Sequence, residues 1–306
     1  MKALNSMAVI LFLLFNSLVA EAQQNEFGAY AVTVDDITKT ISKGPQPGFK
    51  VDVYQAEKKE IENQWSRAIR QDTKSKVENL NNELFITGTI LKSISVKPVN
   101  VYSIINQYED HIELNAFFED SIFLTKEKSE TEYLAARKFL RDFAVEAYRE
   151  AVQKEVKAEE KKLSDLESDL DNLAKENDKL HKRINEKERS ISSDKDKIAT
   201  SELDQERVRK LVQAQKGEVS NVKATGSSEE VVKAAEKKLK ELESEVSKLE
   251  KQEDNLHKDI DKSQAEIREA QRNISDNEHS MELKRGEITK QKEVVYARQK
   301  KLESIK

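Results

Sequence analysis

Apolar residues recur at heptad spacing along most of the chain, which predicts two long helices that each carry one narrow apolar seam. The first seam runs from Val152 to Val222 and the second from Val232 to Ile305. The two registers are out of phase by one residue, so one continuous helix would present its halves at an angle. The a positions are Val156, Leu163, Leu170, Asn177, Ile184, Ile191, Ile198, Gln205, Val212 and Val219 in the first helix, and Val232, Leu239, Val246, Glu253, Ile260, Ile267, Ile274, Met281, Ile288, Val295 and Leu302 in the second.

The stretch "VKATGSSEEVV" separates the two seams and favours a turn over a flexible joint. Gly226 suits the left-handed conformation that ends a helix, and Ser227 followed by Glu230 matches a capping box that begins one. The arms from Arg149 to Val222 and from Val232 to Ile305 have equal length, about 110 Å each at 1.5 Å per residue. We therefore predict an antiparallel hairpin within one chain; the alternative is a parallel homodimer of one longer rod.

Folding back pairs polar seam residues with each other. In the register that places Val222 against Val232, Asn177 lies opposite Asn277, and a buried pair of this kind fixes register in coiled coils. The C-terminal Ile305 and Lys306 then lie at the base of the rod, near Arg149. The tip residues Thr225, Gly226, Ser227 and Ser228 are the predicted contact point for a partner.

The residues before the rod have a different pattern and predict a compact α+β domain. Alternating segments at 29–34, 48–54, 83–96, 99–108 and 111–118, with a weaker one at 121–124, are typical of strands. Residues 42–48, "SKGPQPG", and the pair Glu109-Asp110 are typical of turns. Between residues 56 and 71, four residues recur at helical spacing: Ile61, Trp65, Ala68 and Ile69. The order predicts one antiparallel sheet under helices.

A second helix of this domain is predicted to begin near Ser129 and to continue directly into the rod. Its first part carries a broad stripe that can cover the sheet: Leu134, Phe139, Leu140, Phe143, Ala147 and Tyr148. No proline or glycine occurs between Ser129 and Lys216, so nothing stops the helix at the domain edge.

The first residues predict export from the cytoplasm. Residues 1–22 carry a lysine, a short apolar run and the triplet Ala20-Glu21-Ala22, which together are typical of a signal peptide cleaved after Ala22. The expected organisation is a signal peptide at 1–22, a globular α+β domain at 23–150, and a coiled-coil hairpin at 151–306. The hairpin has arms at about 151–222 and 228–306 and a tip at about 223–227. We expect a periplasmic or secreted protein with no stable membrane insertion after cleavage.

Charge and composition narrow the classes of function. The chain has 53 basic and 58 acidic residues, a net charge of −5, and only 7 Gly and 3 Pro. This balance gives no electrostatic footprint for nucleic acid, and the composition suits long solvated helices. The chain has no cysteine, which excludes disulfides and thiolate metal sites.

No sequence motif predicts catalysis. The chain lacks the phosphate-binding loop of nucleotide hydrolases and the motifs of serine hydrolases and zinc proteases. His111 lies close in sequence to Glu109, Asp110 and Glu113, but a polar hairpin turn explains these residues without a metal or an acid-base site. We therefore predict no catalytic, cofactor-binding or metal-binding residues and no cofactor.

The preferred function is an exported, non-enzymatic coiled-coil scaffold or adaptor that acts as a spacer or docking arm in the cell envelope. We expect a protein partner, whose identity the sequence does not give, and homo-oligomerisation stays open. Two alternatives remain: a ligand-binding α+β module that the coiled coil positions or oligomerises, and an enzyme with an unfamiliar site in residues 25–150.

Overall fold

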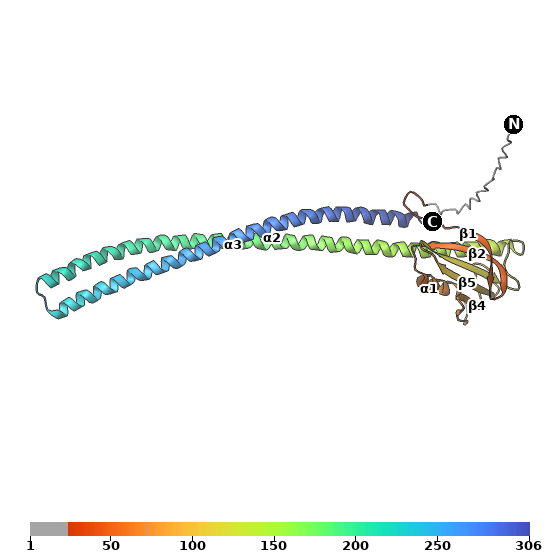
Figure 1. Cartoon of the computed structure of the whole chain (residues 1–306), viewed down its shortest axis with the longest axis horizontal. Helices are drawn as coiled ribbons and strands as arrows, with labels where there is room; N and C mark the ends of the chain where they lie inside the picture. Colours follow the sequence, from red (N-terminus) through yellow and green to blue (C-terminus); the bar gives the residue numbers. More distant parts are fainter. Residues whose placement is uncertain (1–23, 72) are drawn as a thin grey trace, which may run out of the picture. The chain divides into compact units, whose positions relative to one another are not determined.

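A computed structural model describes residues 24–71 and 73–306, and the predicted signal peptide lies outside them. The described residues divide into two compact units: unit 1 contains those up to Lys162 together with Gln291–Lys306, and unit 2 contains Leu163–Lys290. An N-terminal antiparallel sheet with helices is followed by two long helices that pack against each other (Figure 1). The predicted fold class, α+β with a helical hairpin, is therefore confirmed.

Unit 1 contains a six-stranded sheet in the order β1-β2-β6-β5-β4-β3, and every neighbouring pair is antiparallel. Alternation decides which side chains face the helices: in β6, Ile112 and Leu114 point to the core, while Glu113 and Asn115 point to the other face. The strands are β1 (Val34–Ile41), β2 (Gly44–Tyr54), β3 (Glu78–Leu80), β4 (Glu83–Thr89), β5 (Val99–Gln107) and β6 (His111–Glu119).

The prolines of the first hairpin lie in a strand, so the turn predicted for all of residues 42–48 is wrong. Only Ser42 and Lys43 form the turn, and Pro45 and Pro47 belong to β2. A proline cannot donate to a sheet ladder and is therefore confined to positions without a donor role. Here β6 pairs with β2 only from Phe49 onward, so neither proline needs an N–H on that side.

Three other strand predictions differ from the structure. Residues 29–34 form no strand before Val34; Ala29 and Val32 pack into the core as an irregular segment. The segment 83–96 leaves the ladder at Thr89, after a register shift at which Gly88 has φ +67°. Residues 121–124 make only an isolated bridge between Phe123 and Glu119. The short strand β3, whose residues are all exposed, has no apolar alternation and was not predicted.

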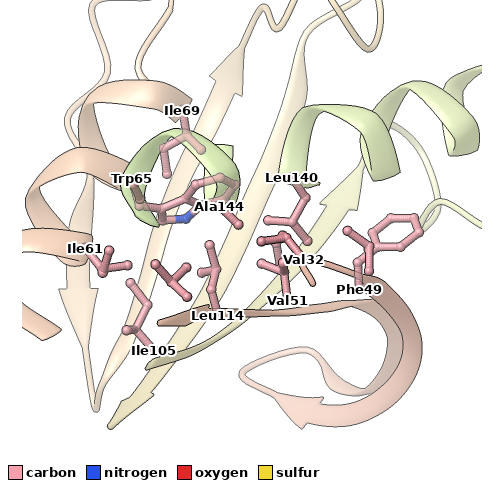
Figure 2. Packing of buried hydrophobic residues seen from close by; sticks show 14 of the residues in the cluster. Val32, Phe49, Val51, Ile61, Trp65, Ile69, Ile105, Leu114, Leu140 and Ala144 are labelled. Atoms are coloured by element: carbon pink, nitrogen blue, oxygen red, sulfur yellow. The ribbon is translucent and has the colours of Figure 1, made fainter. Parts of the chain in front are cut away.

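Helix α1 (Lys58–Ile69) covers one face of the sheet, as predicted. Its buried residues Ile61, Trp65 and Ile69 lie among strand residues such as Leu114 and Ile105 in Figure 2. The Trp65 indole donates to Ser103 Oγ at 2.7 Å, so its one polar group is satisfied. The hydroxyl of Thr89 donates to the carbonyl of Ile69 at 2.7 Å, which satisfies a free carbonyl at the helix end.

Helix α2 (Glu130–Ala224) runs for 95 residues without a break, as predicted from the lack of proline and glycine up to Lys216, and it continues through Gly217. Leu140, Ala144 and Tyr148 pack into the core beside α1 (Figure 2 shows Leu140 and Ala144), while Phe139 and Phe143 lie against Trp65. The predicted stripe was wrong at Leu134, which is exposed, because the helix face turned to the sheet passes through Ala136 instead.

The opposite face of the sheet carries a second small core that the sequence did not predict. Ile41, Tyr102 and Phe117 are buried there together. The carboxylate of Glu83 in β4 accepts hydrogen bonds from the backbone N–H and the hydroxyl of Ser42 in the β1–β2 turn. Because β2, β6 and β5 lie between β1 and β4, this contact requires the sheet to curl around its second face. Gly48 is needed inside the curl, since a Cβ there would lie 2.3 Å from the ring of Phe117.

Helix α3 (Glu229–Ser304) returns antiparallel to α2. Every predicted a position in α2 and α3 is buried or half-buried, which confirms both heptad registers. In unit 2 the buried seam residues include Ile198, Val208, Val212, Ile260 and Ile274. No helix in the part of the chain that the structure describes is long and apolar enough to cross a membrane.

Candidate functional site

The predicted tip residues form the connection between the two long helices in unit 2. Helix α2 ends at Ala224, and Gly226 has φ +70°, the left-handed conformation expected for a helix C-cap. The N–H of Ser227 donates to the carbonyl of Val222 at 3.2 Å, the six-to-one bond of a Schellman motif. The Thr225 hydroxyl donates to the carbonyl of Asn221 at 3.0 Å. The turn is thus closed by its own hydrogen bonds.

The start of α3 differs from the predicted capping box. Because α3 begins at Glu229, Ser228 precedes it in the N-cap position, one residue later than predicted. The Ser227 hydroxyl instead lies 3.1 Å from that of Thr225. The Schellman motif extends through Ser227 and therefore moves the helix start forward by one residue.

Substitution of Gly226 should destabilise the connection, because a side chain strains a left-handed residue even in open space. We expect Gly226→Ala to lower the free energy of unfolding of the hairpin by about 1 kcal/mol. Gly217 provides a matched control: it lies inside α2 with nothing near its missing Cβ, so Gly217→Ala should raise stability by about 1 kcal/mol. Denaturant unfolding of the two variants should therefore shift in opposite directions, and two shifts of the same sign would contradict the assigned turn.

Polar residues occupy several layers of the seam in unit 2. The amide of Asn177 lies 3.9 Å from the sulfur of Met281, and Gln205 donates to Glu253. Asn177 Oδ1 and Asn277 Nδ2 are both buried, and neither has a hydrogen-bond partner within the described part of the chain. The predicted role of Asn177 and Asn277 in register stays a prediction.

Replacing both asparagines tests that role. Because one polar atom on each is already buried and unsatisfied, we expect Asn177→Leu with Asn277→Leu to raise the free energy of unfolding by about 1 to 3 kcal/mol. The pairing register of α2 and α3 should become less specific, which NMR would detect as broadened amide resonances. A double variant less stable than the parent, with coupling in a double-mutant cycle, would mean instead that the amides pair in solution.

A groove of about 860 Å³ follows the two helices of unit 2. Val212 and Val246 lie among its lining residues, and two of its basic lining residues form ion pairs across the helices. Arg209 lies 2.9 Å from Glu250, and Lys216 lies 3.2 Å from Glu243. These exposed pairs add little stability, but they give the hairpin a mixed-charge surface.

The C-terminal end of α3 lies in the core of unit 1, as an intrachain hairpin requires. Ile305 is 2% exposed and belongs to the same buried cluster as Tyr148 and Val152 of α2. Lys301 is 8% exposed, and its ammonium nitrogen lies 6.0 Å from the ring centres of Tyr30 and Tyr148. Burial lowers the pKa of Lys301, and the two rings offset part of the desolvation through cation–π contact. We call this cluster of Tyr30, Tyr54, Tyr148, Lys301 and Ile305 the base cluster.

Polar contacts lie beside the base cluster and further along the two helices. Arg298 pairs with Glu155 at 3.3 Å, and Gln55 donates to the same carboxylate at 2.8 Å. Gln291 donates to both the carbonyl and the carboxylate of Glu159. Tyr54 stacks on Tyr30 at 4.1 Å, and burial, aided by nearby Asp52, raises the pKa of Tyr54 to about 12. The C-terminal part of α3 is thus stabilised by apolar packing, an ion pair and hydrogen bonds.

A strip of polar residues crosses the face of the sheet that the helices do not cover. Glu113 accepts hydrogen bonds from Lys39, Asn106 and Asn115, and Asn115 is only 1% exposed. Burial alone would raise the pKa of Glu113, but these three donors outweigh it and hold the pKa below its usual value. The carboxylate is therefore ionised and fully engaged.

His111 lies at the end of this polar strip. Its ring stacks on Tyr108 at 4.9 Å, Nδ1 lies 2.7 Å from Asp110, and Nε2 lies 3.7 Å from Asp52. Asp52 Oδ1 is buried and has no hydrogen-bond partner among the described residues. Across residues 24–71 and 73–306, no group of three or more His, Asp and Glu side chains is arranged to hold a metal ion.

The base cluster and the polar strip were both missed by sequence reasoning. The residues of each cluster come from segments far apart in the chain, such as Tyr30 with Lys301 and Lys39 with Glu113. The available signal was weak: a lysine at a seam-flanking position, and polar residues at alternate positions of β6.

A scan against protein-family models found no matching family, and searches of curated proteins and of solved structures found no significantly similar protein.

Proposed function

We propose that this chain is an exported, non-enzymatic scaffold or adaptor whose helical hairpin serves as a spacer or docking arm in the cell envelope. One observation carries the proposal: both helices of the hairpin are anchored in the core of unit 1. Helix α2 contributes Tyr148 and Val152, and α3 returns Ile305 to the same cluster. A coiled coil that served oligomerisation alone would not need its returning end in that core.

A docking arm needs an exposed surface that a partner can bind, and the hairpin has such surfaces. Its outer faces are charged and solvated, and its connection ends in small polar residues, Thr225 to Ser228. Partners on such surfaces are recognised through side chains on exposed helix faces or turns. We therefore propose a protein as the partner.

In-cell photo-crosslinking tests this function. A photo-reactive residue at Ser227 of the full chain should give a discrete crosslinked protein in the envelope fraction. Deleting one heptad from each arm, residues 163–169 and 284–290, keeps both registers and should abolish the crosslink, while an unrelated heptad pair of equal length should restore it. A crosslink that is insensitive to arm length would contradict a spacer, and none from Ser227 or from the outer hairpin faces would contradict a docking arm.

Export makes a separate prediction. Small residues at Ala20 and Ala22 fit signal-peptidase cleavage, so the protein recovered from the envelope should begin at Gln23. Intact-mass measurement checks this directly. A mass that retains Met1 to Ala22 would contradict export by cleavage.

A second candidate is a ligand-binding module in unit 1, and the polar strip favours it. Asn115, which is buried, and Asp52 Oδ1, which lies near His111 but has no hydrogen-bond partner among the described residues, are polar groups on the sheet face that the helices do not cover. A thermal-shift screen of small polar ligands on the full chain tests it: a hit that Asp52→Ala abolishes, while Asp142→Ala on the exposed face of α2 does not, would support this function. A flat screen would leave the scaffold function as the better account.

A further inference from the structure

The outer edge of β1 has no neighbouring strand in the described part of the chain. β1 is the end strand of the sheet and is eight residues long. Asp35, Asp36 and Thr38 are exposed, while Ile37 and Lys39 are half-buried. An edge of this length presents unpaired N–H and C=O groups that can pair with another strand.

The prolines of β2 identify which backbone groups of β1 point outward. Pro45 and Pro47 lie opposite Thr40 and Thr38, and a residue without an N–H belongs at a pair that is not hydrogen-bonded across the ladder. Thr38, and by alternation Asp36, therefore direct their N–H and C=O groups away from β2. The outward carbonyl of Val34 already accepts a hydrogen bond from Arg137, so the free stretch of edge is centred on residues 35–39.

This stretch is complementary to itself. If two copies pair antiparallel about a two-fold axis through Ile37, Asp36 lies opposite Thr38 of the second copy, and both residues use the outward groups just described. Asp35 then lies opposite Lys39 twice, and opposite charges at directly facing positions stabilise a strand pair. Asp35 and Lys39 share one face of β1, as this symmetry requires. Ile37 meets its own copy and extends the small core that it packs against.

We propose that β1 is a homodimerisation edge: residues 35–39 pair with the same residues of a second copy about a two-fold axis at Ile37. The pairing is short, so the dimer is weak and dependent on concentration, in the range of small transient interfaces. Lys39 is shared between Glu113 of its own chain, at 3.2 Å, and Asp35 of the second copy. This inference does not depend on the proposed scaffold function.

Cysteine crosslinking tests the register in a chain that has no cysteine of its own. Ile37→Cys places the two sulfurs on the axis at a non-hydrogen-bonded pair, where Cα atoms lie about 4.5 Å apart. Thr40→Cys is the matched control, since its two copies would lie about 20 Å apart along the strands. Under mild oxidation, the Ile37→Cys variant should form a disulfide-linked dimer at least tenfold faster than the Thr40→Cys variant. Equal rates, or a faster reaction of a Thr38→Cys variant, would overturn the register.

Charge reversal tests whether the strand that pairs with β1 belongs to a second copy of this chain. Asp35→Lys alone and Lys39→Asp alone each place like charges opposite each other, so each should sediment as a monomer at concentrations where the parent dimerises. Mixed in equal amounts, they restore two opposite-charge pairs and should form a heterodimer. If each variant melts at the same temperature as the parent, its fold is intact. A parent that stays monomeric at high concentration, a mixture that does not associate, or pairing of the edge only with an extended peptide of another protein would overturn the proposal.

Discussion

Trp65→Ala should destabilise unit 1 by about 3 to 5 kcal/mol, one of the largest effects expected of a single substitution. Trp65 is fully buried and touches Phe139 and Phe143 of α2 at ring distances of 5.8 and 4.9 Å, so its removal leaves a cavity between α1, α2 and the sheet. It also leaves Ser103, which is fully buried, without the indole as its donor. Calorimetry of the full chain measures the loss.

Two further variants serve as controls for the calorimetry of Trp65→Ala. Trp65→Phe keeps most of the ring volume and loses the hydrogen bond, so it should cost less than Trp65→Ala. Leu134→Ala removes a large apolar side chain that is exposed on α2 and should change stability by no more than about 0.5 kcal/mol. If Leu134→Ala cost as much as Trp65→Ala, the assignment of the helix face that covers the sheet would be wrong.

Ile305→Ala should lower the stability of unit 1 by about 2 to 5 kcal/mol, although it lies one residue from the last position of the sequence. Ile305 is buried with Tyr148 and Val152, so its truncation opens the core at the place where α3 returns. Fluorescence of Trp65, the only tryptophan in the chain, follows this unfolding directly.

In the Ile305→Ala protein, backbone amide hydrogens in the last turns of α3 should exchange faster because this end of the core has lost stability. Val294→Ala is the matched control because it truncates an exposed apolar residue of α3, the helix that Ile305 directly follows. An Ile305→Ala protein as stable as the Val294→Ala protein would show that the end of α3 is not part of the core.

The long helices could be predicted because the position of a residue in the heptad repeat indicates whether it is buried in a coiled coil. Heptad spacing depends only on neighbours along one helix, so the seam positions followed from the sequence alone, including polar ones such as Asn177 and Gln205 that are buried in the structure. The turn could be placed because Gly226 is needed for a left-handed residue. The error of one residue at Ser227 arose because two capping patterns overlap there.

The sheet was harder to predict because its geometry depends on residues far apart in the chain. Pro45 and Pro47 are typical of turns, and only the absence of β6 beside them allows them into a strand. The curl depends on Ser42 meeting Glu83, and Gly48 is required by Phe117. No local pattern contains these pairs.

The same limit applies to the candidate sites. Thr225 to Ser228 could be located because the connection is local. Lys301 lies over the rings of Tyr30 and Tyr148, a site that exists only after the hairpin has closed, so its burial could not be predicted from a helix pattern. Long-range pairing, rather than residue type, defines the base cluster and the polar strip.

Crosslinking at the base of the hairpin tests the account most directly. Glu155 and Arg298 form an ion pair at 3.3 Å, and both are only partly exposed. With Glu155→Cys and Arg298→Cys in the full chain, a short bismaleimide should give an intrachain product at the monomer mass, while each single variant should give none. A double variant that links only between chains would show that α3 does not return to unit 1 of its own chain and would contradict the anchored hairpin.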